Sequence, residues 1–548
     1  MKVTSSDPGL CHHTHMSKAA GMIALSLLFF LPPWHAYALT INNIILPDAI
    51  QYQPYSAPAL TASQGTPPYT WSVTSKYSSL PEGMGLNAST GVISASSIGG
   101  QGAYLFQVHV SDSPGATATA TFTINVAADN TLGGCDIFPG DSIFRQRVDY
   151  LPVDTSAAAP IYPAYQSSHL HVFFGSEASP DYPDPNGIPF FRVPYNQPLV
   201  QMTFTEYGDE SDAPYGWISN YVTTYPFPAN APVEGSANSG GDMHVLILQT
   251  AGGGQPCKLW EVWQGIYNGD STWSSSNGAY WDLSSNNLRP GGYTSGDAAG
   301  LPIMPYTVNY DEVASGTVKH AIRFTVNHML NGYVWPARHA AGYGSCSGIP
   351  AGSELSQTAP PTSCSMSGPS GQIYRLTAAA YAAASATCPA NTHPQASVII
   401  KAMRQYGIIL ADNGQTGGLI GTPDSRWVTD DLACLTNIAL AQFEPVNVGS
   451  LRISADSGAT KSIRLVHNGS QVNLYATFHD AYTAASGGDT IQAKAFVIAE
   501  TLTLAKDIEI SLEGGYDSAF ETNPLVTTIR GSLAISGGAA TIDGIAIE

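Results

Sequence analysis

The chain carries little charge, and most of that charge is negative. Only 11% of its 548 residues are Asp, Glu, Lys or Arg, and 21 Lys and Arg stand against 41 Asp and Glu. The formal net charge is −20 at pH 7. Such a surface repels nucleic acid and anionic membranes, so neither is expected as a partner. Neutral glycans, proteins and Ca²⁺ remain compatible with it.

The sequence also lacks the motifs that identify several enzyme classes. It has no nucleophile elbow, phosphate-binding loop or HExxH pattern, which disfavours serine proteases, NTPases and zincins without excluding them. It has no CxxC pair, which disfavours a zinc ribbon. The sequence therefore leaves open whether the protein is an enzyme.

Long apolar runs are missing except near the start. Lys18 is followed by an uncharged apolar run over 19–31, which Pro32 and Pro33 end, and residues 36–38 (Ala-Tyr-Ala) have the small-x-small pattern of a signal peptidase site. The run is shorter than the roughly 20 residues that span a bilayer. We expect residues 1–38 to be a cleaved signal peptide; the alternative is a membrane anchor.

Two details complete the export prediction. The mature chain is expected to begin at Leu39, to lack a transmembrane segment and to be secreted or held at the cell surface. Three histidines before Met16 are unusual in the basic start of a signal peptide, so either Met1 or Met16 is the start.

What the chain has in abundance is turn residues. It contains 54 Gly, 38 Pro and 28 Tyr, a balance that suits short strands joined by many turns. Its length indicates about three domains. We predict a mostly β protein: an Ig-like β-sandwich over 39–127, a large β-sandwich or jelly-roll-like domain with a few helices over 128–446, and a short parallel-β-helix-like module over 447–548.

Cysteines support an oxidising compartment. Cys11 falls in the expected signal peptide, and six cysteines remain: Cys135, Cys257, Cys346, Cys364, Cys388 and Cys434. An even number in an exported chain predicts two or three disulfides among 15 connectivities. Cys346 and Cys364 flank a Gly/Ser/Pro-rich loop and are the first expected pair.

The first module shows the alternation of half-buried strands. Tyr104, Phe106, Val108 and Val110 share one face at period two, and turn signals stand at 65–68, 81–83 and 113–115. Further short strands are expected at 70–73, 91–94 and 118–126.

The same module resembles the Ig-like and cadherin-like repeats of bacterial surface proteins. The resemblance rests on GTPPYTWS at 65–72, LPEG at 80–83, TGVIS at 90–94, GAY at 102–104 and VSDSPGA at 110–116. It implies a spacer or adhesion role. Related cadherin folds bind Ca²⁺ between consecutive repeats, but only one repeat is visible here and its acids are sparse (Asp48, Asp112 and Asp129). Calcium stays open as a cofactor.

The central region is expected to contain strands at 170–174, 199–204, 244–248, 260–263 and 320–326. A helix is expected from Pro394 to Tyr406, ended by Gly407, and a second helix near Thr429. The region resembles a domain of secreted bacterial proteins without a known activity. That resemblance is carried by GDMHV at 241–245, WEVW at 260–263, LRPGGYTSGDAAGLPI at 288–303, YDEV at 310–313, HAIRFT at 320–325, WPARH at 335–339 and YGIILADNG at 406–414.

The last module is expected to contain strands at 489–495, 508–512, 527–535 and 540–547. A spacing of about 18 residues is near one rung of a parallel β-helix. Residues 478–491 resemble the entry to a right-handed β-helix of the pectate-lyase type, where a helix caps the first rung. Only two or three rungs fit, so the resemblance implies no catalytic residue and the module is interpreted as accessory.

Histidines suggest the candidate metal ligands. His169 and His171 share one face of a strand because residues two apart do so, and His244 lies on another strand beside Asp242. Together with Asp112 of the first module, they are the candidate metal ligands. The alternative is that each histidine is a hydrogen-bonded structural residue.

Carboxylates provide the candidate catalytic acids: Glu261, Asp282, Asp297, Asp311, Glu312 and Asp412. Paired acids hydrolyse glycosides at suitable separations. Asp297 is the most suggestive because it lies in a Gly/Thr/Ser loop. The alternative is that it accepts hydrogen bonds from loop N–H groups, as Asp commonly does.

Basic residues are scarce, so those that lie within apolar runs are candidate site residues. We expect Asp297, His320, Arg323, Arg338 and His339 to converge in one polar cluster, since a charge inside an apolar run must be paired. Open to solvent, the cluster would be a ligand site, with an Arg holding a carboxylate. Sealed, it would be a structural ionic network.

Two functions follow. In the first, the central region recognises or processes extracellular glycans, stacking sugars on Trp263, Trp273, Tyr280, Trp281 and Trp335. In the second, the protein is a non-catalytic structural or adhesion protein of the cell surface. A deep cleft lined by Asp297, Glu261, His320 and Arg338 would favour the first function, and a closed core that pairs them would favour the second.

Overall fold

The computed structural model describes most of the chain after the expected signal peptide. The described residues are 38–42, 44, 46, 47, 49, 50, 55–73, 80, 81, 83–95, 98, 102–127, 132–175, 178, 179, 182–185, 187–217, 219–235, 241–521, 523 and 526–548. Residues 1–37 of the expected signal peptide lie outside them, as do Asp48 and Asp129. Over these ranges, no helix is both long and apolar enough to cross a membrane.

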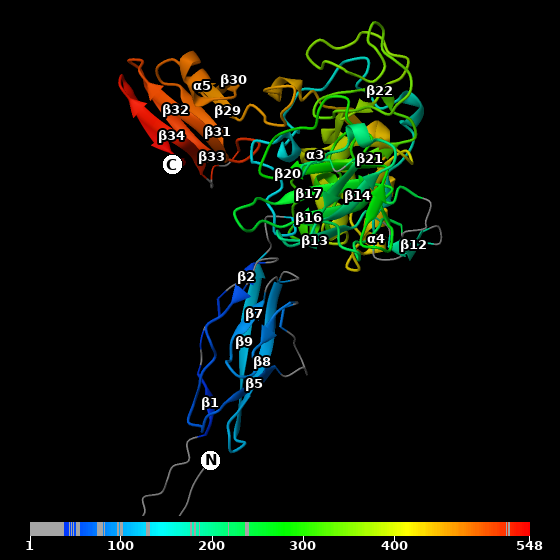
Figure 1. Cartoon of the computed structure of the whole chain (residues 1–548). Coiled ribbons are helices and arrows are strands. Elements are labelled where there is room, and N and C mark those ends of the chain that lie inside the picture. Colours follow the sequence, from blue (N-terminus) through cyan, green and yellow to red (C-terminus); the bar gives the residue numbers. More distant parts are fainter. Residues whose placement is uncertain are drawn as a thin grey trace, which may run out of the picture.

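The N-terminal module (blue in Figure 1) is a set of antiparallel strands with one parallel pair. Its main sheet has the order β2-β9-β8-β5, beside a sheet β3-β7-β6 and a pair β1-β4. The strands are β1 (Thr40–Ile41), β2 (Ala49–Ile50), β3 (Tyr55–Ser56), β4 (Ala62–Ser63), β5 (Thr70–Val73), β6 (Gly85–Leu86), β7 (Ile93–Ala95), β8 (Gly102–Ser111) and β9 (Thr117–Ala127).

The predicted alternation in β8 is confirmed. Phe106, Val108 and Val110 are buried, while Leu105, next to Phe106, is 59% exposed. Trp71 of the neighbouring strand β5 completes the same core. Period-two burial of this kind is what a strand with one solvated face requires.

The central region is built from several small open sheets. A six-stranded sheet has the order β10-β27-β21-β26-β25-β28, and two four-stranded sheets have the orders β13-β16-β17-β20 and β15-β14-β19-β18. The strands are β10 (His171–Phe173), β11 (Ala178–Ser179), β12 (Tyr182–Pro185), β13 (Phe190–Val193), β14 (Val200–Phe204), β15 (Val222–Tyr225), β16 (Val245–Gln249), β17 (Lys258–Trp263), β18 (Ile266–Tyr267), β19 (Trp273–Ser275), β20 (Asn277–Asp282), β21 (Ile322–Val326), β22 (Leu330–Tyr333), β23 (Ser353–Glu354), β24 (Pro369–Ser370), β25 (Ile373–Leu376), β26 (Ile408–Asn413), β27 (Gly418–Ile420) and β28 (Phe443–Pro445).

Short helices accompany the six-stranded sheet. They are α1 (Tyr310–Ala314), α2 (Ala378–Thr387), α3 (Pro394–Gln405) and α4 (Thr429–Leu432), and both α2 and α3 contact β25. The predicted helix limits at Pro394 and Thr429 are confirmed. Helix α2 was missed, although its alanine run favours a helix and Thr377 caps its first turn by accepting from the N–H of Ala380.

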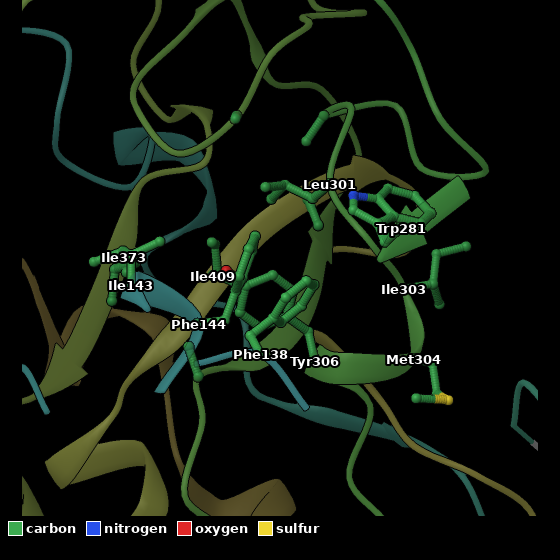
Figure 2. Close-up of a cluster of buried hydrophobic side chains, with 14 of the residues drawn as sticks. Phe138, Ile143, Phe144, Trp281, Leu301, Ile303, Met304, Tyr306, Ile373 and Ile409 are labelled. Atoms are coloured by element: carbon green, nitrogen blue, oxygen red, sulfur yellow. The ribbon is translucent and has the colours of Figure 1, made fainter. Parts of the chain in front are cut away.

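The largest apolar core of this region packs against the four-stranded sheet β13-β16-β17-β20 (Figure 2). The rings of Phe138 and Phe144 stack with centroids 4.4 Å apart, and Tyr306 meets Phe144 edge-on at 5.3 Å. Trp281 of β20 and Ile409 of β26 belong to the same cluster, so this core joins two sheets.

The C-terminal module (orange to red in Figure 1) has the connectivity of a short solenoid. Its strands alternate between two parallel stacks, β31-β33-β35 and β32-β34-β36. Helix α5 (Phe478–Ala484) and the hairpin β29-β30 precede the first stack. The strands are β29 (Ile463–His467), β30 (Ser470–Tyr475), β31 (Thr490–Lys494), β32 (Val497–Leu504), β33 (Glu509–Tyr516), β34 (Thr527–Ile535), β35 (Ala539–Asp543) and β36 (Ile545–Ile547).

Rung spacing in this module is less regular than expected. The register pairs Thr490 with Ser511 and Ser511 with Thr541, so the second rung is longer than the first. The mostly β fold class is confirmed, while the family resemblances of the central and C-terminal regions stay predictions.

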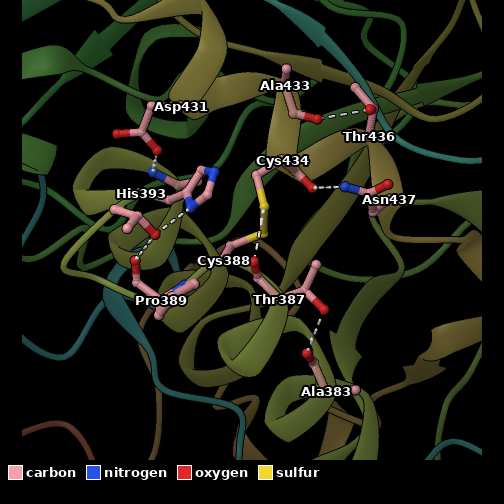
Figure 3. The surroundings of a disulfide bond; sticks show 12 residues. Ala383, Thr387, Cys388, Pro389, His393, Asp431, Ala433, Cys434, Thr436 and Asn437 are labelled. Carbon is pink, nitrogen blue, oxygen red and sulfur yellow. Dashed lines mark hydrogen bonds between the residues drawn. A yellow bond between two sulfur atoms is a disulfide. The ribbon is translucent and has the colours of Figure 1, made fainter.

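All six expected disulfide cysteines are paired. The bonds are Cys135–Cys257, Cys346–Cys364 and Cys388–Cys434. The predicted pair of Cys346 with Cys364 is confirmed. Figure 3 shows the third bond, which ties the end of α2 to the segment after α4, where the side-chain amide of Asn437 donates to the carbonyl of Cys434 at 3.1 Å.

Candidate functional site

The expected polar cluster forms in part, around a fully buried ion pair. The loop between β20 and α1 presents Asp297, whose carboxylate accepts from Nε of Arg323 on β21 at 2.8 Å. The same guanidinium reaches Asp412 at the end of β26, 2.9 Å away. One arginine therefore serves two carboxylates.

The shared arginine leaves an excess of negative charge. Burial raises the pKa of Asp412 to about 7, and the nearby charge of Asp297 raises it further than Arg323 lowers it. Burial also raises the pKa of Asp297, opposed by Arg323. Since Asp297 takes the two-pronged contact with Arg323, Asp297 ionises first, and Asp412 is ionised as well above about pH 7.

His244, immediately before β16, carries a second buried charge. Its Nδ1 lies 2.5 Å from the Glu234 carboxylate and its Nε2 lies 2.8 Å from the carbonyl oxygen of Gly296. Both partners are acceptors, so both ring nitrogens carry protons and the ring is cationic. Burial alone would lower the pKa of His244, but the Glu234 carboxylate raises it to about 9.

Glu261 of β17 is enclosed by backbone donors. Its carboxyl accepts from the N–H groups of Ile303 and Met304 at 2.8 Å each. Burial raises its pKa to about 7, although these hydrogen bonds lower it. A carboxyl with no exposed surface and this many internal donors holds a loop in place.

His320 and Arg338 lie apart from this cluster. His320 contacts Glu312 at 3.2 Å and the carbonyl of Ala321. The Arg338 guanidinium turns away to Asp456, 2.6 Å distant. The expected convergence of five residues is thus wrong for these two.

His339 does lie beside the cluster. Its Nδ1 donates to the carbonyl of Ala298, next to Asp297, at 2.8 Å. Within the described residues, the structure therefore brings together Asp297, Arg323, His339 and Glu261, along with Asp412 and His244.

The candidate metal ligands do not form a shared site. His169 and His171 are exposed with Leu170 buried between them, as their shared face predicts. His244 has both ring nitrogens occupied, and Asp112 accepts from the N–H of Ala116 in its own turn and from the N–H of Thr66. Among the described ranges, no group of three His, Cys, Asp or Glu side chains is placed to hold a metal.

A cavity of about 220 Å³ opens beside the ion pair. We call it the Asp412 cavity. It lies where β17 and β26 end and β20 begins, between the two sheets that share the large core. Its lining residues are Tyr207, Asp242, Trp263, Asn277, Thr294, Ser295, Gly296, Ala298, His339, Ala341, Asp412 and Asn413.

Several residues of this site escaped prediction from the sequence. Glu234, which charges His244, Asp456, which holds Arg338, and Tyr207 of the cavity stand in loops without a local pattern. Conversely, Trp273, Trp281 and Trp335, expected as sugar-stacking residues, are buried with exposures of 1%, 3% and 2%. Trp263 is the expected stacking tryptophan that lines the cavity.

Comparison with known proteins identifies one part of the chain. Residues 38–127 match the family model described as "Putative Ig domain". The N-terminal module is Ig-like. This match covers a minority of the chain and leaves the central region without a family. No curated protein matches the chain.

Solved structures add only weak similarity. Drosophila N-cadherin EC1-4 is 8% identical with a TM-score of 0.15, covering 44% of this chain and 48% of that chain. The human Desmocollin-1 ectodomain is 11% identical with a TM-score of 0.14, covering 43% and 41%. The chain thus spans less than half the length of either ectodomain, and scores this low carry no structural argument.

Proposed function

We propose that the protein is a non-catalytic structural or adhesion protein of the cell surface, exported and disulfide-bonded. The observation that carries this proposal is the sealing of two candidate catalytic acids, Asp297 and Glu261. Asp297 and Glu261 have no exposed surface, and each is held by internal donors. An acid in this position cannot touch a substrate, whereas it can fix the fold of a domain that presents a surface.

The N-terminal module supports the same proposal. An Ig-like domain is a common spacer or adhesive unit, and this one precedes a large domain braced by three disulfides. Disulfides are typical of proteins that work outside the cytoplasm.

Glycan processing has less support. The cleft that it requires would be lined by Asp297, Glu261, His320 and Arg338, but the last two have partners elsewhere. Three of the five aromatics expected to stack on sugars are part of the core instead.

The test uses the full mature chain on beads. We expect coated beads to aggregate or to bind bacterial cell envelopes saturably, while beads carrying heat-unfolded protein do not. In parallel, the soluble protein is assayed against a panel of polysaccharides for release of reducing ends. Turnover that a folded E261Q or D297N variant loses would overturn the proposal, and so would the absence of any bead or envelope binding.

A further inference from the structure

Most of the side-chain donor atoms that line the Asp412 cavity already have a partner inside the protein. The Asn277 amide donates to the carbonyl of Ser295, and the Asn413 amide donates to that of Ala341. The single hydroxyl proton of Ser295 lies between the Leu301 and Asp297 carbonyls, and His339 donates through Nδ1 to Ala298. Most side-chain donors that line the cavity thus have partners inside the protein.

Acceptors, in contrast, remain available. The Asp412 carboxyl keeps 19% of its side chain exposed beside the cavity, and its oxygens have lone pairs left beyond the contacts from Arg323 and Asn413. Asp242 is exposed at the rim. His339, with its proton on Nδ1, presents Nε2 as a third acceptor.

The cavity has a net negative charge, which favours the same kind of ligand as its available hydrogen-bond acceptors. Arg323 divides its charge between Asp297 and Asp412, while Asp242 adds a further carboxylate. The cationic ring of His244 is balanced by Glu234. The negative charge is therefore uncompensated, and a bound cation would relieve it.

Two aromatic rings complete the lining. Tyr207 and Trp263 lie with ring centroids 6.2 Å apart and planes tilted by 40°. Trp263 also donates its indole N–H to Asp242 at 3.3 Å, which orients the ring beside that carboxylate. Aromatic faces attract cations, and Trp does so most strongly.

We propose that the Asp412 cavity binds an ammonium group, with its N–H donors on the Asp412 and Asp242 carboxylates and its alkyl chain against Tyr207 and Trp263. The cavity is smaller than the roughly 300 Å³ at which drug-sized sites begin, which suits one short alkylammonium rather than an oligosaccharide. The ammonium could belong to a small amine or to a lysine side chain of another protein. This inference stands on the cavity alone and does not depend on the adhesive role.

The test is calorimetric titration of the full mature protein at pH 8. The probes are N-acetyl-lysine methylamide, propylamine and the neutral isostere N-acetyl-norleucine methylamide. We expect the lysine probe to bind and the norleucine probe not to bind. Equal binding by propylamine identifies a small amine as sufficient, while preference for the lysine probe indicates a protein ligand.

Variants localise the binding. D242N should weaken the lysine probe by about fivefold, the size of one exposed charge pair. Y207L should weaken it by about threefold through loss of a cation–π contact. The matched control is D507N, which removes an exposed acid of the C-terminal module and should leave affinity within about twofold.

Several outcomes would overturn the inference. They are equal binding of the norleucine and lysine probes, no binding by either amine at about 20 mM, and equal weakening by D507N and D242N. Thermal unfolding of each variant checks that it is folded, and because Asp242 and Tyr207 are exposed, both variants are expected to fold.

Discussion

Arg323 donates through Nε to Asp297 at 2.8 Å, and the Asp297 side chain has no exposed surface. A charge in that position depends on its partner for stability. We expect D297N to lower the free energy of unfolding by about 3–5 kcal/mol, because it leaves Arg323 buried with only Asp412 as a counter-charge. Urea denaturation followed by fluorescence measures this.

The control for this prediction is D424N. Asp424 pairs with Arg426, whose side chain is 41% exposed, so its loss should cost under about 1 kcal/mol. An unchanged midpoint for D297N together with lost ligand binding would instead support a functional role for Asp297.

Buried groups near the ion pair make stability depend on pH. The pKa of His244 is raised from 6.5 to about 9, and that of Glu261 from 4.5 to about 7. A raised pKa contributes stability that is complete below the unfolded-state value and is lost as pH rises through the folded value. The Glu261 contribution is therefore lost from pH 4.5 to about 7, and that of His244 from pH 6.5 to about 9.

Urea denaturation across this range checks the prediction. We expect the free energy of unfolding of the central domain to fall as pH rises. E261Q should make the lower part of the decline shallower, since Asp412 still titrates there, and leave the upper part unchanged. A profile that rises from pH 5 to pH 9, or an E261Q profile parallel to the parent, would contradict it.

Lys494 at the end of β31 gives the opposite pH dependence at the contact between the central and C-terminal modules. Its Nζ donates to the side-chain oxygen of Gln146, and burial lowers its pKa to about 7. A lowered lysine pKa favours the neutral form, so the contribution is present above the unfolded-state value of 10.5 and is lost as pH falls from there through about 7. We expect acidification from pH 8 to 6 to weaken this contact.

Hydrogen exchange of amides near Gln146 and Lys494, corrected for intrinsic rates, measures this. Protection should fall at pH 6 in the parent and stay constant in K494M, while K401M, which alters an exposed lysine, should behave as the parent. Constant protection in the parent would exclude the effect.

Two of the three disulfides should contribute different amounts to the free energy of unfolding. Cys135–Cys257 closes a sequence separation of 122 residues and Cys346–Cys364 one of 18. In the chain-entropy description, a disulfide that closes a longer loop stabilises the folded state more. Removal of both Cys135 and Cys257 should therefore lower the free energy of unfolding by about 1–2 kcal/mol more than removal of Cys346 and Cys364. Denaturation of the two double serine variants tests the order, and the reverse order would show that native packing decides instead.

Local features of this protein follow from its sequence. Burial alternates along β8, α3 begins at Pro394 and ends before Gly407, and Cys346 pairs with Cys364 across a short loop. Each of these depends on neighbours within a few residues, where periodicity, fixed proline geometry and short loop closure act.

Only the tertiary structure decided which charges meet. Arg323 and Arg338 both occupy apolar surroundings, yet one pairs with Asp297 and the other turns to Asp456, 118 residues further along the chain. A buried charge requires a partner, but the sequence does not say which of many acids will be near. The Asp412 cavity likewise combines residues from 207 to 413, because the packing of two sheets on one core brings the ends of β17 and β26 together.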